Sequence, residues 1–241
     1  MTTEDVMDQV RPPAPIADVL VELHGVVKSY RRGPEEVHAL RGVDLSLHAR
    51  EVVALIGPSG SGKTTLLNLL CGWESPDAGE IRWRGAADTV LRDLPWRELA
   101  VLPQDLGLLE ELSIRENVEL PLRLADMVGP ESAKRVGAML EGFGLDRLAD
   151  RSPSEVSLGE QQRTALGRAL VASPRLLLAD EPTGHQDEGW ARVVMRSLRL
   201  AAREGTSCLV ATHNREAIKY VDEVIAIRDG LVRRTGTPTR T

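Results

Sequence analysis

The chain has few aromatic residues, few cysteines and no long apolar run. Of its 241 residues, 3% are aromatic and two are cysteine, although 42% are hydrophobic. No window approaches the roughly 18 to 20 consecutive apolar residues that a membrane-spanning helix requires. Any membrane role is therefore expected to come from a partner. The N-terminal stretch MTTEDVMDQVRPPAP lacks the apolar segment of a secretory signal, and residues 1–17 are expected to form a flexible lead-in.

Clustered positive charge is also scarce. The net charge is −6, and no basic block interrupts the sequence. Neutralising the phosphates of nucleic acid needs a local excess of Lys and Arg, so no nucleic-acid partner is expected. The two cysteines, Cys71 and Cys208, lie in separate apolar segments without CxxC spacing. We expect buried reduced thiols of a cytoplasmic protein rather than a disulfide or a metal site.

Three apolar runs lack polar alternation: EVVALIG (51–57), RLLLAD (175–180) and SCLVATH (207–213). Such runs are typical of strands buried on both faces in a parallel sheet that helices cover. The earlier segments VLVELHGVVKSY and HALRGVDLSLHAR alternate apolar and polar residues, which predicts a small region of antiparallel strands. Two short strands are expected around the turn Asp229-Gly230, followed by a polar tail.

Helical periodicity dominates residues 105–158. A capping box, Ser113-x-x-Glu116, predicts one helix, and a second helix is expected to follow Pro130 and stop near Gly144. The predicted fold class is α/β, with a mostly parallel core sheet, a small antiparallel β-subdomain and a helical insertion. The predicted parts are the β-subdomain with the first part of the core at 18–104, the helical subdomain at 105–158, the second part of the core at 159–232 and the tail at 233–241.

The segment GPSGSGKTT fits the phosphate-binding pattern GxxxxGK[ST] between a predicted strand and a predicted helix. Its backbone N–H groups and the N-terminus of the following helix would bind phosphate oxygens. Lys63 would neutralise the β- and γ-phosphates, and the Thr64 hydroxyl would coordinate Mg²⁺. The alternative is a glycine-rich turn with a solvated lysine. The predicted nucleotide-binding residues here are Gly57, Pro58, Ser59, Gly60, Ser61, Gly62, Lys63, Thr64 and Thr65.

Two acidic residues end the second apolar run. Asp180 and Glu181 lie at the C-terminal end of a predicted buried strand, where ligands of open α/β sheets bind. Asp180 would hold the Mg²⁺ shell, and Glu181 would polarise or deprotonate the attacking water. Acids at strand ends also commonly cap the next helix, but their occurrence after a phosphate loop favours the catalytic interpretation.

Further motifs follow in the order found in ABC ATPases, and the chain resembles that family over nearly its whole length. Tyr30 resembles the aromatic residue that stacks on adenine, and Gln104, in VLPQ, resembles the glutamine that reaches the metal and the attacking water. His213, in ATH, is similar to the histidine that contacts the γ-phosphate. Each has a plainer alternative: an edge-strand aromatic for Tyr30, a surface residue for Gln104 and a core histidine for His213.

The segment VSLGEQQR (156–163) resembles the family signature LSGGEQQR, and Asp187, in EPTGHQD, falls in the loop after the Walker B acids. The resemblance implies that Ser157 and Gly159 approach a γ-phosphate. Ser157 to Glu160 is also a plain capping box, which alone would explain Ser157. The sequence departs from the family at Leu158, where glycine is usual, and at residues 185–186 (His, Gln), where Asn and Leu are usual. These departures put full activity in doubt, but not ATP binding.

The resemblance implies a P-loop NTPase cassette that binds ATP and Mg²⁺, hydrolyses ATP as a head-to-tail dimer and drives a separate membrane subunit from the cytoplasmic face. The second cassette could be identical or different. The run LLEELSIRENVELPLRL (108–124) and EPTG are similar to the macrolide-export and lipoprotein-release ATPases. Two alternatives remain: a soluble ABC protein of DNA or translation processes, and a regulatory cassette that hydrolyses ATP poorly because of Leu158.

Overall fold

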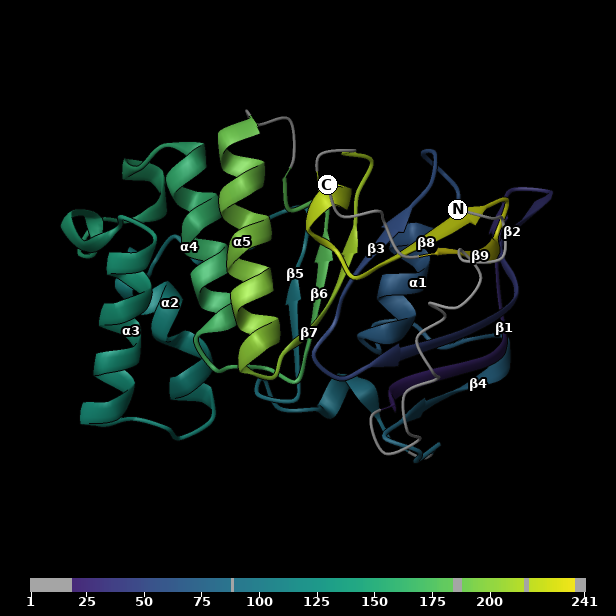
Figure 1. Ribbon diagram of the computed structural model, residues 1–241, viewed down its shortest axis with the longest axis horizontal. Coiled ribbons are helices and arrows are strands. Elements are labelled where there is room, and N and C mark those ends of the chain that lie inside the picture. The colour runs from purple at the N-terminus through teal and green to yellow at the C-terminus, as the bar shows by residue number, and fades with distance from the viewer. Residues whose placement is uncertain (1–18, 88, 184–187, 215–216, 237–241) are drawn as a thin grey trace, which may run out of the picture.

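The computed structural model describes residues 19–87, 89–183, 188–214 and 217–236. Within these residues the strands form two sheets (Figure 1). The larger sheet has six strands in the order β5-β6-β7-β3-β8-β9. In that order the strands are Leu99–Leu102, Leu176–Asp180, Ser207–Ala211, Val52–Ile56, Glu223–Arg228 and Leu231–Gly236. The first five are parallel and β9 alone is antiparallel, as the unalternating apolar runs predict.

The smaller sheet is antiparallel and has the order β2-β1-β4. Its strands are β1, Val19–Arg32; β2, Glu35–His48; and β4, Ala78–Trp83. Alternation along β2 leaves one face exposed and buries Leu45 and Leu47 on the other. The prediction of a small antiparallel region is confirmed.

The described residues include five α-helices. They are α1, Lys63–Leu70; α2, Ile114–Leu124; α3, Pro130–Gly142; α4, Leu158–Leu170; and α5, Glu188–Glu204. Of these, α1, α4 and α5 pack against the large sheet, while α2 and α3 lie beyond α4 (Figure 1). Short 3-10 turns lie at Leu91–Asp93, Asp146–Leu148, Pro153–Glu155 and Ala217–Tyr220. The capping box at Ser113 begins α2 as predicted, because Ser113 Oγ accepts the Glu116 N–H and Glu116 accepts the Ser113 N–H.

The central strands β3, β6 and β7 are buried on both faces because two separate apolar layers cover them. In β6, Leu176 and Leu178 face the layer formed with α1 and the small sheet, whereas Leu177 and Ala179 face the layer formed with α4 and α5. This alternation puts α1 and α4 on opposite faces of the sheet. The edge of the sheet at which the carboxyl ends of β3 and β6 lie therefore has helices on both sides.

A third apolar cluster lies in the helical insertion and joins α2, α3 and the segment after α4. Val136 and Leu140 of α3 are buried in it with Val118 of α2, and Phe143 packs against it. Helix α4 begins at the predicted boundary of this subdomain and then packs on the core sheet, so it belongs to both parts.

Two details concern the remaining predictions. Strand β9 continues to Gly236, four residues into the segment predicted as a polar tail, because it pairs with β8 along that length. Cys71 and Cys208 are buried free thiols, and burial raises their pKa values to about 11 and about 12. In the part of the chain that the structure describes, no helix is long and apolar enough to cross a bilayer.

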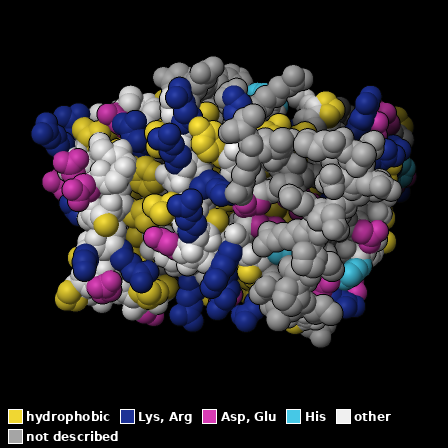
Figure 2. Space-filling view, in the orientation of Figure 1, with side chains coloured by type: hydrophobic (Ala, Val, Ile, Leu, Met, Phe, Trp, Pro, Cys, Tyr) yellow, Lys and Arg dark blue, Asp and Glu magenta, His cyan; other side chains and the backbone are white. Residues whose placement is uncertain are grey.

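Basic side chains gather over the helical face of the molecule (Figure 2). Helix α5 exposes Arg192, Arg196 and Arg203, while Val194 and Leu198 pack inward. This is the pattern of an amphipathic helix with a solvated outer face.

Candidate functional site

The phosphate loop connects β3 to α1 and is held tightly by the neighbouring backbone. A Cβ atom on Gly57 would lie 2.2 Å from Ile227 O, so only glycine fits there. Gly62 has φ 107°, and a Cβ on it would lie 2.5 Å from Ala39 O. Pro58, Ser59 and Gly60 at the tip are exposed, and Ser61 is buried. The loop thus offers an open concave turn on a fixed base.

Lys63, the first residue of α1, folds back over this turn. Its Nζ donates hydrogen bonds to Gly57 O at 2.9 Å and to Pro58 O at 3.1 Å. The ammonium group is therefore at the mouth of the loop, where phosphate oxygens would compete with these carbonyls. This is the position that the sequence pattern predicts for it.

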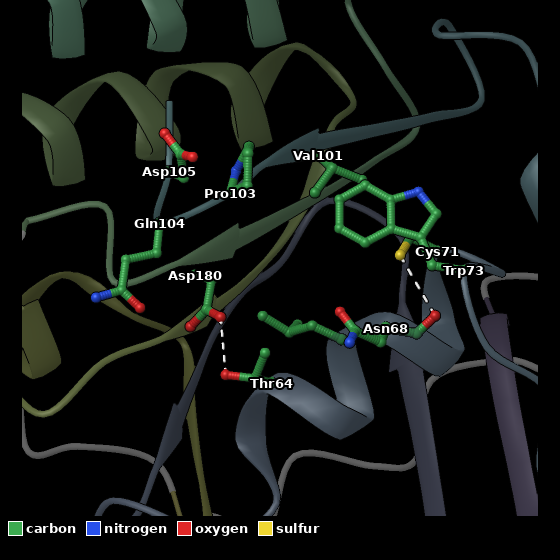
Figure 3. A pocket seen from close by; sticks show the side chains of 10 residues that line it. Thr64, Asn68, Cys71, Trp73, Val101, Pro103, Gln104, Asp105 and Asp180 are labelled. Carbon is green, nitrogen blue, oxygen red and sulfur yellow. Dashed lines mark hydrogen bonds between the residues drawn. The ribbon is translucent and has the colours of Figure 1, made fainter. Parts of the chain in front are cut away.

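Thr64 and Asp180 meet across the gap between α1 and the end of β6. Thr64 Oγ1 donates to Asp180 Oδ2 at 2.9 Å (Figure 3). Both side chains line a pocket of about 460 Å³, together with Gln104 from the segment after β5. Burial raises the pKa of Asp180, while the hydrogen bond from Thr64 and the charge of Lys63 oppose that shift. Three oxygen-bearing side chains from distant parts of the sequence thus share one pocket.

Glu181 and His213 form a second pair beside Asp180. His213 Nδ1 lies 2.9 Å from Glu181 Oε2. The Glu181 N–H donates to Ala211 O at 2.9 Å, so the ends of β6 and β7 hold the two residues together. Glu181 has φ 49°, an uncommon conformation for a residue other than glycine, and such outliers cluster at functional sites. The carboxylate is largely buried, whereas the imidazole is exposed.

Tyr30 lies on β1 and is tied to the segment after α1. Its hydroxyl donates to Glu74 Oε2 at 2.6 Å and lies 3.5 Å from Thr65 Oγ1. Asn68 Nδ2 donates to the other carboxylate oxygen of Glu74 at 3.0 Å. Burial and the bond to Glu74 raise the pKa of Tyr30. The ring, 38% exposed, is held near the phosphate loop with surface left for a ligand.

Ser157 and Gly159 stand at the start of α4. Ser157 N–H donates to Glu160 Oε2 at 2.7 Å, and Ser157 Oγ donates to the same oxygen at 2.8 Å. The plain capping box is therefore present. Leu158 is 59% exposed and projects from the first turn. Since α4 and α1 cover opposite faces of the sheet, these residues belong to a surface apart from the phosphate loop of their own chain.

The structure brings most of the predicted site residues together at one sheet edge but leaves two apart. Thr64, Gln104 and Asp180 line one pocket, and Glu181 pairs with His213. The predicted nucleotide-binding residue Asp187 lies outside the described residues. Glu74, the partner of Tyr30, and Asn68, which bonds to Glu74, have no signal in the sequence beyond their position just after the phosphate loop.

Comparison with protein families gives a match over this same region. The family model described as "ABC transporter" matches residues 40–184. These residues contain the phosphate loop, Gln104, the start of α4 and the acids that end β6. Tyr30, Asp187 and His213, which are also predicted site residues, lie outside the match.

The chain is similar over most of its length to named relatives. It is 39% identical over 221 residues to "Lipoprotein-releasing system ATP-binding protein LolD 2" of Caulobacter vibrioides, covering 89% of this chain and 97% of that protein. It is 38% identical over 217 residues to "Macrolide export ATP-binding/permease protein MacB" of an Azoarcus species. That alignment covers 88% of this chain but 33% of the relative, which is a much longer protein.

Solved structures share the fold. A dimeric ATP-binding cassette in a post-hydrolysis state, bound to ADP and Pi, superimposes with a TM-score of 0.82 at 33% identity, covering 90% of this chain and 98% of that one. A dimeric bacterial ABC transporter cassette gives a TM-score of 0.81 at 33% identity, covering 89% and 97%.

Proposed function

The chain belongs to the ABC transporter family as an ATP-binding cassette, and from this premise we propose how its residues divide the work of ATP hydrolysis. The fold is that of an ABC cassette, and the chain is an ATPase subunit that works with a membrane subunit. The observation that supports the proposed roles best is the meeting of Lys63, Thr64 and Asp180 at the ends of β3 and β6.

Lys63 is the proposed electrostatic clamp on the β- and γ-phosphates. Its Nζ now bonds to the carbonyls of Gly57 and Pro58, and these bonds hold the ammonium over the loop. Phosphate oxygens, which carry full negative charge, would replace the carbonyls as acceptors. Ser59, Gly60 and Thr65 would add donors around the same phosphates.

The pocket also fits Mg²⁺. Thr64 Oγ1, Asp180 and the Gln104 amide supply the oxygen ligands that this hard cation prefers, and bound phosphates and water would complete its shell. Mg²⁺ would neutralise charge that develops on the phosphates. In the chain itself, the burial that raises the pKa of Asp180 leaves a carboxylate that a cation would stabilise.

Glu181 is the proposed general base. Its carboxylate is largely buried beside the pocket, and His213 Nδ1 at 2.9 Å orients it. Glu181 would accept the proton of the attacking water as the water oxygen bonds to the γ-phosphorus and the bond from that phosphorus to the β–γ bridging oxygen breaks, so that ADP leaves. The exposed edge of the His213 ring would contact the γ-phosphate.

The start of α4 is proposed to complete the nucleotide site of a second cassette. Solved relatives are dimeric, and Ser157 and Gly159 lie on a surface apart from their own phosphate loop. In a head-to-tail pair, this surface of one chain would cover the nucleotide of the other. The contacts of Ser157 and Gly159 to the γ-phosphate would exist only in the closed dimer. Loss of the γ-phosphate on hydrolysis would therefore let the dimer open.

The proposal further puts the chain on the cytoplasmic face of the cell membrane, held there by its membrane subunit. The relative MacB is named as an ATP-binding and permease protein in one chain, and the present chain matches a third of it. LolD 2 is named as the ATP-binding protein of a lipoprotein-releasing system. A role in lipoprotein release or export from the membrane is therefore the proposed context.

The test of the catalytic assignment is Glu181→Gln. Glutamine preserves the size of the side chain and an oxygen beside His213, but it cannot accept a proton from water at neutral pH. We expect turnover to fall on the order of a hundredfold or more while ATP affinity is kept. The ATP-bound dimer should accumulate, as size-exclusion chromatography would show.

The matched control is Glu131→Gln, the same change on the exposed surface of α3, which should leave both properties unaltered. Near-normal hydrolysis by Glu181→Gln would remove Glu181 from the role of general base. Identification of a membrane protein that co-purifies with the chain would test the proposed context.

A further inference from the structure

Arg168 is a buried cation that the proposed chemistry does not use. It lies on α4 with 7% of its surface exposed. Burial lowers its pKa, but a guanidinium remains charged at neutral pH. Among the residues that the structure describes, no carboxylate forms an ion pair with it. Its partners are backbone carbonyls instead.

Both hydrogen bonds of Arg168 reach the segment that follows Gln104. Nη1 donates to Gly107 O at 2.7 Å, and Nη2 donates to Leu106 O at 2.5 Å. These acceptors stand two and three residues after Gln104 in the chain. One rigid side chain therefore holds two consecutive carbonyls of the loop that begins at the pocket.

The far end of the same loop has its own anchor, on α2. Asn117 is fully buried, accepts the Leu109 N–H at 2.9 Å and donates to Leu109 O at 2.9 Å. It also donates to Leu112 O and Ser113 O, each at 3.1 Å. The segment between Gln104 and α2 is thus fixed at both ends, and only the end nearer Gln104 depends on α4.

The cost of burying Arg168 argues for a specific role. A charged group removed from water needs full compensation, and carbonyl dipoles compensate it less well than a carboxylate. Well-packed apolar residues often replace buried charges without loss of stability. A long apolar side chain would therefore serve packing alone, but it could not hold the two carbonyls.

We propose that Arg168 is a positioning residue for Gln104, which it acts on by tying the loop after Gln104 to the helix that begins at Ser157. The inference rests on the proposed role of Gln104 at the metal and the attacking water. Without the guanidinium, the loop loses its anchor next to Gln104, and the amide leaves the pocket shared with Thr64 and Asp180. The phosphate loop, which α1 and β3 hold, is unaffected.

The test measures steady-state hydrolysis and equilibrium ATP binding in the full chain carrying Arg168→Met. Methionine fills much of the space without donors. We expect kcat to fall roughly tenfold to a hundredfold, because a small displacement of a catalytic group reduces the rate by about this factor. The Mg²⁺ concentration for half-maximal rate should rise, and the Kd for ATP should change by less than about twofold, since the phosphate loop is untouched. Arg168→Lys keeps the charge and one donor group, so this variant should retain part of the kcat that Arg168→Met loses.

A double-mutant comparison separates positioning from general damage. If Arg168 acts through Gln104, the pair Gln104→Ala and Arg168→Met loses no more kcat than Gln104→Ala alone. If the losses of kcat in the two single variants multiply in the double variant, the inference is overturned. A normal kcat in Arg168→Met together with a low kcat in Gln104→Ala would overturn the inference about Arg168 but leave the proposed role of Gln104 intact. If Gln104→Ala leaves both kcat and the Mg²⁺ requirement unchanged, the proposed role of Gln104 fails, and the inference with it.

Loss of stability is controlled with Leu198→Ala on α5. Leu198 is fully buried and distant in sequence from both anchors of the loop, and its truncation costs about 2 to 5 kcal/mol. At a similar loss of Tm it should retain the native kcat. An equal fall in kcat in this variant would show that destabilisation explains the Arg168 effect, and would overturn the inference. Should Arg168→Met not fold, Arg168→Lys with the same measurements decides the question.

Discussion

The nucleotide edge of the large sheet and the start of α4 hold their polar groups by different means. At the sheet edge, contacts join segments that are far apart in the chain: Thr64 of α1 bonds to Asp180, and His213 lies beside Glu181. Each is fixed by a buried strand end or by the first turn of α1. This part of the site is already assembled in a single chain.

The start of α4 is assembled differently. Ser157 bonds only within its own capping box with Glu160, and Leu158 projects outward. Nothing from the core sheet is needed to shape it, because the box is local to one helical turn. It is a finished and exposed surface, suited to meeting another molecule.

Electrostatics shows the same contrast. Burial raises the pKa of Asp180, so the ionised carboxylate destabilises the free protein. The pKa of Glu160 is lowered, chiefly by the Ser157 N–H and then by the Ser157 hydroxyl, so its ionised form stabilises the helix start. The buried charge of Asp180 thus lowers the stability of the free protein, and a bound ligand would offset this loss. The charge of Glu160 at the start of α4 has no such destabilising effect.

The largest expected effect is that of Asp180→Asn, which removes the costly charge. Mg²⁺-dependent hydrolysis should fall on the order of a hundredfold or more, since one ligand oxygen loses its charge. The free protein should become more stable at pH 7. The sign follows because a raised folded-state pKa means that stability declines as pH rises from the unfolded value, and asparagine removes this decline.

Thermal unfolding at pH 7 without nucleotide, together with an ATPase assay, checks both parts of this prediction. If Asp180→Asn is less stable than the native chain, the charge of Asp180 does not destabilise the free protein, and the electrostatic contrast with Glu160 fails.

Tyr30→Ala should have the next largest effect. If the ring stacks on the base, affinity for ATP and GTP should fall alike by roughly 1 to 3 kcal/mol, about 5- to 150-fold in Kd. Tyr30→Phe is the control, because it keeps the ring and loses only the bond to Glu74. Equilibrium titration measures both. Unchanged affinity in Tyr30→Ala would leave this residue as an ordinary edge-strand aromatic.

Leu158→Gly probes the exposed surface itself. If the Leu158 side chain hinders closure of a second cassette over its nucleotide, removing it should raise the basal ATPase rate a few-fold, or about 1 kcal/mol in barrier. Leu158→Ala removes the bulk but keeps helix propensity, so it should also accelerate turnover. A rate that stays the same or falls in both variants of a homodimer would show that the chain accommodates Leu158.

The smallest effect is expected from Glu160→Gln. The depressed pKa of Glu160 means that its ionised form adds stability above the unfolded value near 4.5, and that this gain is lost as pH falls through the folded value. The variant should therefore have a slightly lower Tm than the native chain at pH 7, and this difference should shrink as the pH falls below 4.5. Because Glu160 is near the surface, the difference should be modest. A large effect on Tm would mean that this turn is not self-contained.

Local patterns in the sequence predicted much of the fold and of the site. The apolar runs predicted β3, β6 and β7, and the capping box at Ser113 predicted the start of α2, because both depend on a few adjacent residues. The pattern from Gly57 to Thr64 predicted a strand, a loop and a helix, which the structure confirms. The turn Asp229-Gly230 predicted two short strands, and β8 and β9 flank it.

Contacts between distant segments were beyond local patterns. That Tyr30 reaches Glu74, 44 residues away, and that Arg168 reaches Gly107, 61 residues away, follows from how β1, α1 and α4 pack. No periodicity or motif encodes such a pairing, because it depends on side-chain reach across elements that fold onto different faces of the sheet.

The sequence by itself determined the phosphate loop, the acids at the end of β6 and the capping box of α4, because each needs only residue types at fixed short spacing. Only the tertiary structure decided that Thr64, Asp180 and Gln104 line one pocket. It alone also separated Ser157 from that pocket. The physical reason is that parallel strands bring their carboxyl ends to one edge whatever their distance in the chain, whereas helices on opposite faces stay apart.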